Sequence, residues 1–179
     1  MPGTDLTLTG TPSQHFSGRG LKDGNKTLWS SWVLATQRHR VFFSGDTGLT
    51  PEYAHTHARY GDFDLVMLEI GAFHPAWSGI HLGPENALAA HALLGGGPLL
   101  PIHWGTFNLA LHPWDEPVET LLRLAPKTDT QLLLPRLGQP IEPAHQIPVE
   151  TWWRGVDVLP ESPAPPDEEL PKEMPWPID

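Results

Sequence analysis

Short apolar runs, separated by glycine and proline, fill the first 139 residues of this chain and limit the folds open to it. The runs are rich in Val, Leu, Phe and Trp, a composition typical of strands. Two of them, 63–70 and 99–102, are nearly all apolar and are expected inside a sheet. The runs together predict six strands, at residues 6–10, 27–36, 40–44, 63–70, 99–102 and 131–135.

Helical patterns alternate with the later strands. Residues 84–94 begin with Pro84 and are followed by Gly95, which is the usual punctuation of a helix. Residues 117–125 follow Asp115, a candidate N-cap, and stop before a proline. A weaker helical pattern covers 51–60. Strands that alternate with helices predict an α/β fold.

Composition excludes some classes of function and indicates two regions in the chain. A formal net charge of -10 makes nucleic-acid binding improbable, because phosphate needs clustered Lys and Arg. The absence of cysteine excludes disulfides and thiolate ligands, so any metal must use histidine and carboxylate. No apolar run is long enough to span a membrane and no signal peptide is recognisable, so we expect a cytoplasmic protein. Residues 1–139 form the expected domain, and residues 140–179 form a proline-rich acidic tail, partly mobile, that Trp152, Trp153 and Trp176 could attach to the domain.

Three apolar runs end close to a potential metal ligand. His15 follows the first run, Asp46 follows residues 40–45, and His103 follows residues 99–102. Sites in α/β sheets form at the carboxyl ends of strands, so these side chains could converge on one metal. Imidazole and carboxylate suit zinc, with iron or manganese as alternatives. A role in turns or capping stays open for each residue.

The remaining polar residues give weaker signals. His81 precedes the expected helix at 84–94, where it could face the same site or lie in a surface loop. No serine-nucleophile elbow and no phosphate-binding glycine loop is present. Asp62, Asp64 and Glu69 surround one strand without a spacing typical of acid–base catalysis. Six of the other histidines are interpreted as packing or surface residues, or carry no functional signal: His39, His55, His57, His91, His112 and His145.

Longer motifs resemble a known family. They include Thr-Pro-Ser-Gln-His-Phe-Ser-Gly-Arg-Gly at 11–20, Phe-Ser-Gly-Asp-Thr-Gly at 43–48 and Ile-His-Trp-Gly-Thr-Phe at 102–107. Residues 25–32 and 109–117 continue the pattern in the same order. The chain resembles the metallo-β-lactamase superfamily, and within it the N-acyl-phosphatidylethanolamine-hydrolysing phospholipase D group.

The resemblance implies a fold and a site. The family fold is an αββα sandwich with two zinc ions between its halves, and this chain resembles the C-terminal half. His15 would bind the first zinc, Asp46 would bridge both and take part in catalysis, and His103 would bind the second. His81 would lie near the substrate phosphate as a proton donor or oxyanion partner. The expected reaction is attack of zinc-activated water on a phospholipid phosphodiester or a related ester.

The sequence also departs from the family. The His-x-His-x-Asp-His string that supplies the other zinc ligands is absent, so we expect a chain that begins midway through the domain. Zinc binding by this chain alone should then be weak or partial. An apolar sheet face would be open to water and should favour self-association or an N-terminal partner chain. The alternatives are a non-catalytic interaction module and a homodimer with a shared metal site, and peripheral contact with a membrane stays open.

Overall fold

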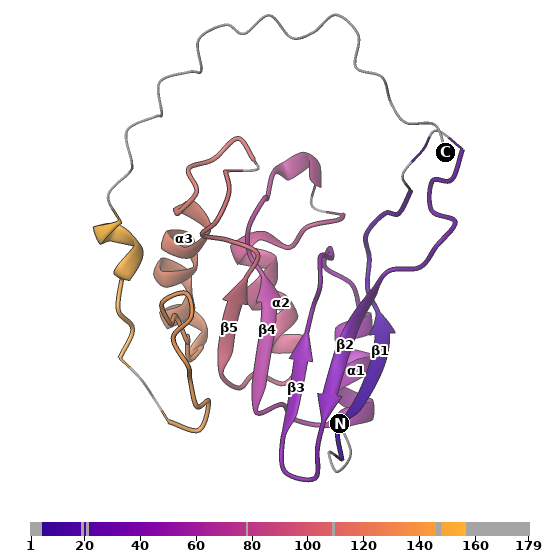
Figure 1. The fold of residues 1–179 in the computed structure, drawn as a ribbon, viewed down its shortest axis with the longest axis horizontal. Coiled ribbons are helices and arrows are strands. Elements are labelled where there is room, and N and C mark those ends of the chain that lie inside the picture. Colours follow the sequence, from indigo (N-terminus) through magenta and orange to yellow (C-terminus); the bar gives the residue numbers. More distant parts are fainter. Residues whose placement is uncertain are drawn as a thin grey trace, which may run out of the picture.

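The computed structural model describes residues 5–18, 20, 22–77, 79–108, 110–145 and 148–156. A five-stranded sheet forms its centre, and the strands follow one another across the sheet in chain order (Figure 1). β1, β2 and β3 are antiparallel, whereas β3, β4 and β5 are parallel. The strands are β1 Thr7–Pro12, β2 Ser30–Ala35, β3 Arg40–Phe43, β4 Leu65–Glu69 and β5 Leu99–Ile102.

The prediction of a sixth strand at 131–135 is wrong. This segment forms only an isolated bridge between Leu132 and Leu99. The Leu99 N–H donates to the Gln131 carbonyl at 2.9 Å, and the Leu133 N–H donates to the Leu99 carbonyl at 2.8 Å. The next donor along β5 would be residue 101, but Pro101 has no N–H. Pairing therefore stops after one bridge.

The three predicted helices are present, each close to its expected bounds. They are α1 Glu52–Tyr60, α2 Gly83–Leu93 and α3 Glu116–Leu124. Asp115 occupies the N-cap position of α3, but its side chain makes no capping hydrogen bond, which corrects the expected role. Short 3-10 turns follow at η1 Pro75–Trp77, η2 Ala125–Thr128 and η3 Trp152–Gly155. No described helix is long and apolar enough to cross a membrane.

One face of the sheet forms the hydrophobic core. The strand register aligns Val33, Phe42, Val66 and Leu99 in one row, and all four are buried. α1 and α2 lie behind the sheet in Figure 1, on this face, and α3 packs against α2 beside β5. Tyr53 of α1 closes the row, with its ring 5.9 Å from that of Phe42. Core packing thus involves only one side of the sheet.

The opposite face is apolar but open. Register aligns Trp32, Phe43, Met67 and Leu100 in one row across β2 to β5. Trp32 is 41% exposed, and the other three are partly exposed. A second row contains Leu8, Leu34, Val41 and Leu65; Leu8 is 57% exposed, Leu34 and Val41 are partly exposed, and Leu65 is buried. No helix or strand within the described ranges packs on this face (Figure 1), which agrees with the expected open surface.

The start of the predicted tail is attached to the domain. Trp153 is buried, and its ring lies 5.4 Å from that of Trp104. Arg154 forms two hydrogen bonds with Glu119 of α3, at 2.7 and 2.6 Å, and the Trp153 indole donates to the same carboxylate at 2.9 Å. The expected attachment by Trp152 and Trp153 is therefore present. The rest of the predicted tail, 157–179 with Trp176, lies outside the described residues.

Candidate metal centre

Four segments deliver polar side chains to one edge of the sheet. β1, β3, β4 and β5 run in the same direction, so their carboxyl ends share that edge. His15 follows β1, Asp46 follows β3 and His103 follows β5. His81 precedes α2. The parallel arrangement thus gathers residues that are far apart in sequence, as the strand-end pattern predicted.

His103 lies at the centre of the cluster. Its Nε2 atom is 3.7 Å from Oδ1 of Asp46. Its backbone has a φ of 62°, a value that residues other than glycine rarely adopt. The turn fits only because Gly71 lies against it, since a β-carbon there would overlap the His103 carbonyl. The local backbone therefore aims His103 into the site at some conformational cost.

The other two histidines surround the same space. The His81 ring stacks on that of His103, with centroids 5.4 Å apart and planes 13° from parallel. The His15 ring meets His81 edge-on at 5.2 Å. The structure thus brings together all four residues selected from the sequence as metal-binding or catalytic candidates. Their ligation of a metal stays a prediction.

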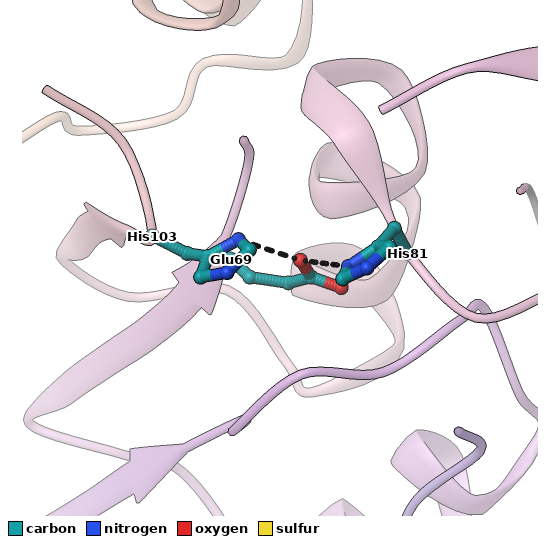
Figure 2. Close-up of side chains that lie close together, drawn as sticks. All are labelled: Glu69, His81 and His103. Atoms are coloured by element: carbon teal, nitrogen blue, oxygen red, sulfur yellow. Dashed lines mark hydrogen bonds and ion pairs between the residues drawn. The ribbon is translucent and has the colours of Figure 1, made fainter. Parts of the chain in front are cut away.

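Glu69 is a further member of the cluster that sequence reasoning did not select. It ends β4, is fully buried and reaches His81 and His103 (Figure 2). Its Oε2 atom lies 2.8 Å from Nδ1 of His81 and 3.3 Å from Nδ1 of His103, although the second contact lacks hydrogen-bond geometry. The sequence did hold a signal, because a glutamate within a nearly apolar strand is rarely buried without a partner.

The electrostatics of the cluster favour charged forms. Burial alone would raise the pKa of Glu69, but the contacts with His103 and His81 and the Thr47 N–H outweigh it, so the pKa is lowered. The Glu69 carboxylate in turn raises the pKa of His103, against the opposing effect of burial. Glu69 is therefore an anion that favours positive charge on His103.

The loop that carries Asp46 is fixed from several sides. The Thr47 N–H donates to Oε1 of Glu69 at 3.0 Å, and the Thr47 hydroxyl accepts from the Gln14 N–H at 2.9 Å. The Gly48 N–H donates to the Gln14 carbonyl at 2.7 Å, which joins this loop to the segment of His15. These bonds hold the loop of Asp46 against the segment of His15.

Each histidine of the cluster presents one free nitrogen. Nδ1 of His15 lies 3.0 Å from the Phe16 carbonyl, so it must carry the proton. Its Nε2 atom is buried and has no hydrogen-bond partner. Nδ1 of His81 and of His103 faces Glu69, which leaves their Nε2 atoms free. Among the described residues, Glu69, His81 and His103 have ligand atoms within 4.8 Å of one another, and imidazole with carboxylate is a donor set that fits zinc.

The other described histidines lie elsewhere. His91 is buried, and its Nε2 atom bonds the Gly97 carbonyl at 2.9 Å. His57 pairs with Asp62 at 3.0 Å beside α1. His112 accepts from the Phe73 N–H at 3.3 Å. None of the three belongs to the cluster.

The fold and the site together define a class: an α/β sheet protein with a candidate metal centre of imidazole and carboxylate at the carboxyl edge of its strands. The family can be stated as well. Residues 1–104 match the Beta-lactamase superfamily domain, and the chain belongs to this family.

Similar proteins agree with this assignment. An uncharacterised protein of Mycobacterium tuberculosis is 45% identical over 153 residues, which cover 84% of this chain and 41% of the relative. The N-acyl-phosphatidylethanolamine-hydrolyzing phospholipase D 1 of Caenorhabditis elegans is 32% identical over 145 residues, covering 76% of this chain and 41% of that protein. The chain therefore spans about two fifths of the length of these relatives. The resemblance seen in the motifs is confirmed.

A solved structure shows the shared fold. A metallo hydrolase from the archaeon Ignicoccus hospitalis superposes with a TM-score of 0.54 at 21% identity. The match covers 73% of this chain and 50% of that chain. The predicted fold class, half of a metallo-β-lactamase α/β sandwich, is thereby confirmed.

Proposed function

We propose that this chain carries part of the zinc site of a metal-dependent hydrolase that cleaves phosphodiesters or related esters. One observation carries the proposal: the Asp46 carboxylate and the rings of His15, His81 and His103 gather at one edge of the sheet, around the buried Glu69. A metal-binding role explains why these side chains, which come from segments far apart in the sequence, gather at one place.

The residues divide the work as follows. His15, Asp46 and His103 would hold zinc, which when bound supplies Lewis-acid activation of water and of the ester oxygen. His81 would face the substrate phosphate, where its protonated Nε2 donates a hydrogen bond or a proton to the leaving oxygen. The Glu69 carboxylate accepts a hydrogen bond from Nδ1 of His81 at 2.8 Å, which holds this ring in place.

A lipid ester is the proposed substrate class. The similarity to phospholipases of Caenorhabditis elegans and of Saccharomyces cerevisiae mitochondria, at 32% and 35% identity, supports it. The loops at the site edge also expose apolar side chains to water. Phe107 and Leu111, beyond His103, are 72% and 88% exposed, and Leu28, on the loop after β1, is 95% exposed. Such side chains suit contact with acyl chains at a lipid surface.

Hydrolysis tests this proposal. The full chain, supplied with zinc, should hydrolyse N-acyl-phosphatidylethanolamine in mixed micelles, and Asp46→Ala and His103→Ala should each abolish the activity. His39→Ala, in the exposed turn between β2 and β3, is the matched control and should retain it. Equal rates in the wild type and the two site variants, or equal zinc binding by all three proteins, would reject the proposed function for this chain.

An interaction module is the second candidate, and the open sheet face favours it. We propose that this face packs against a second apolar sheet face, as the half-length match to a solved relative suggests. In a preparation of this chain alone, only another copy can supply such a face. Light scattering at micromolar concentration should then show self-association, and a monomer throughout would reject this role.

A further inference from the structure

Resting on the proposed function, we propose that Glu69 is a positioning residue that sets the tautomer and the orientation of both His81 and His103. It would do so by accepting the Nδ1 protons of the two rings with one carboxylate oxygen. In the neutral rings the proton would then lie on Nδ1, so that Nε2 of His103 faces Asp46 and Nε2 of His81 can take up the proton that it passes to the substrate. Glu69 would act through the histidines and need not touch the metal.

The two carboxylate oxygens of Glu69 contact different groups. Oε1 accepts the N–H groups of Thr47 and Leu82, each at 3.0 Å. These two residues are the immediate neighbours of Asp46 and His81 in the chain. Oε2 faces the two imidazoles, at 2.8 and 3.3 Å (Figure 2). One carboxylate therefore ties three segments of the site together and still addresses both rings.

Direct metal ligation by Glu69 fits the distances less well. Ligand atoms around a tetrahedral zinc, each about 2.0–2.1 Å from the ion, lie roughly 3.3 Å apart. The 2.8 Å separation of Oε2 and Nδ1 of His81 is shorter and is typical of a charge-assisted hydrogen bond. The arrangement is that of a carboxylate behind a histidine, which fixes the ring and leaves the other nitrogen for the metal or the substrate.

The burial of Glu69 argues against a purely incidental position. It ends a nearly apolar strand and is 0% exposed. A buried carboxylate is costly unless it is paired and hydrogen-bonded. Here the contacts with His81 and His103 offset that cost.

The variant Glu69→Gln tests the proposal, because it keeps the shape and removes one acceptor. The Thr47 and Leu82 N–H groups require the amide oxygen on their side, so the amide NH2 faces the histidines. Facing a donor, His81 and His103 must turn an unprotonated Nδ1 toward it, and the proton moves to Nε2. The variant should therefore carry both rings in the opposite tautomer.

Nitrogen NMR of the histidine-labelled, metal-free full chain reads this directly at alkaline pH, where the imidazoles are neutral. The wild type should show His81 and His103 with the proton on Nδ1, and Glu69→Gln should show it on Nε2. The variants His81→Gln and His103→Gln assign the signals. His15 is the internal control, since its Nδ1 bonds the Phe16 carbonyl and should not change.

Cobalt binding supplies a second readout. The affinity of Glu69→Gln for Co2+ should fall about 10- to 100-fold, with a changed absorption spectrum. Wild-type rings protonated on Nε2 would overturn the proposal without any variant, as would unchanged tautomers in Glu69→Gln. Both results are independent of hydrolysis. If Asp46→Ala and His103→Ala bind zinc like the wild type while the tautomers are as predicted, the proposed function is rejected and the role of Glu69 stands.

Discussion

The two faces of the sheet differ most clearly at two adjacent phenylalanines of β3. Phe42 is 1% exposed and packs its ring against Tyr53 and Phe63. Phe43 points to the other face, in the open row with Trp32 and Met67, and is partly exposed. The sequence is equally apolar on both sides, but only one side has helices to cover it. The difference teaches that the described chain holds one complete core and one surface suited to a partner.

The candidate metal centre lies at the edge that both faces share. Glu69 points to the same side of the sheet as the open face, because it is two residues beyond Met67 and four beyond Leu65 in β4. The loops of Asp46 and His103 cap that edge. The molecule therefore has three distinct regions. Helices cover one face, the other face is open to a partner, and the edge between them carries the candidate metal centre.

The largest expected effect comes from the two phenylalanines. Phe42→Ala should lower the free energy of unfolding by about 3–5 kcal/mol, because it leaves a cavity in the core. Phe43→Ala should cost less than about 1 kcal/mol, since its side chain already meets water. Urea unfolding at low protein concentration measures both. Equal losses would mean that the open face is covered in solution.

The edge gives the next effect. Gly71→Ala places a methyl group against the His103 carbonyl, so it should cost about 1–3 kcal/mol and displace the His103 turn. Gly24→Ala is the control, because a β-carbon there meets nothing within 4 Å. Thermal unfolding compares the two variants. A neutral Gly71→Ala would show that the tight contact behind His103 is not required.

The open face should respond to charge rather than to cavity formation. Trp32→Lys places a cation in the middle of the apolar row and should weaken self-association about tenfold, or about 1.4 kcal/mol. Gln37→Lys adds the same charge in the exposed turn before β3 and should leave association unchanged. Sedimentation or light scattering distinguishes them. If both variants associate like the wild type, the copies meet through another surface.

The sequence predicted some of these elements better than others. The five strands and three helices follow from short apolar runs and from Pro and Gly punctuation, which are local signals. The failed strand at 131–135 depended on its neighbour, since Pro101 ends the pairing that the leucines favour. Local pattern does not show which strand lies beside which.

The site was predictable in part for the same reason. His15, Asp46 and His103 follow strands, so their convergence could be expected from topology, and the family resemblance added His81. Glu69 lies inside a strand, and its role depends on two rings that arrive from segments 12 and 34 residues away. The only sign of this role in the local sequence was a glutamate within a nearly apolar strand.

The smallest expected effect concerns the segment attached to α3. Hydrogen bonds from Arg154 lower the pKa of Glu119 from 4.5 to about 2. Because the folded pKa is depressed, this contribution to stability is present above about pH 4.5 and is lost as pH falls toward about 2. The unfolding-temperature difference between wild type and Glu119→Gln should shrink over that range. Glu142→Gln, in an exposed loop, is the control. A constant difference for Glu119→Gln would contradict a stabilising role of the Arg154–Glu119 contact.

Equilibrium dialysis of zinc against the full chain tests the central claim most directly. The site described here predicts saturable binding by the wild type, lost in both Asp46→Ala and His103→Ala and retained in His39→Ala. Unfolding curves of the metal-free proteins show that the variants remain folded. Zinc uptake that is equal in the wild type and both site variants would contradict a metal centre at this edge of the sheet.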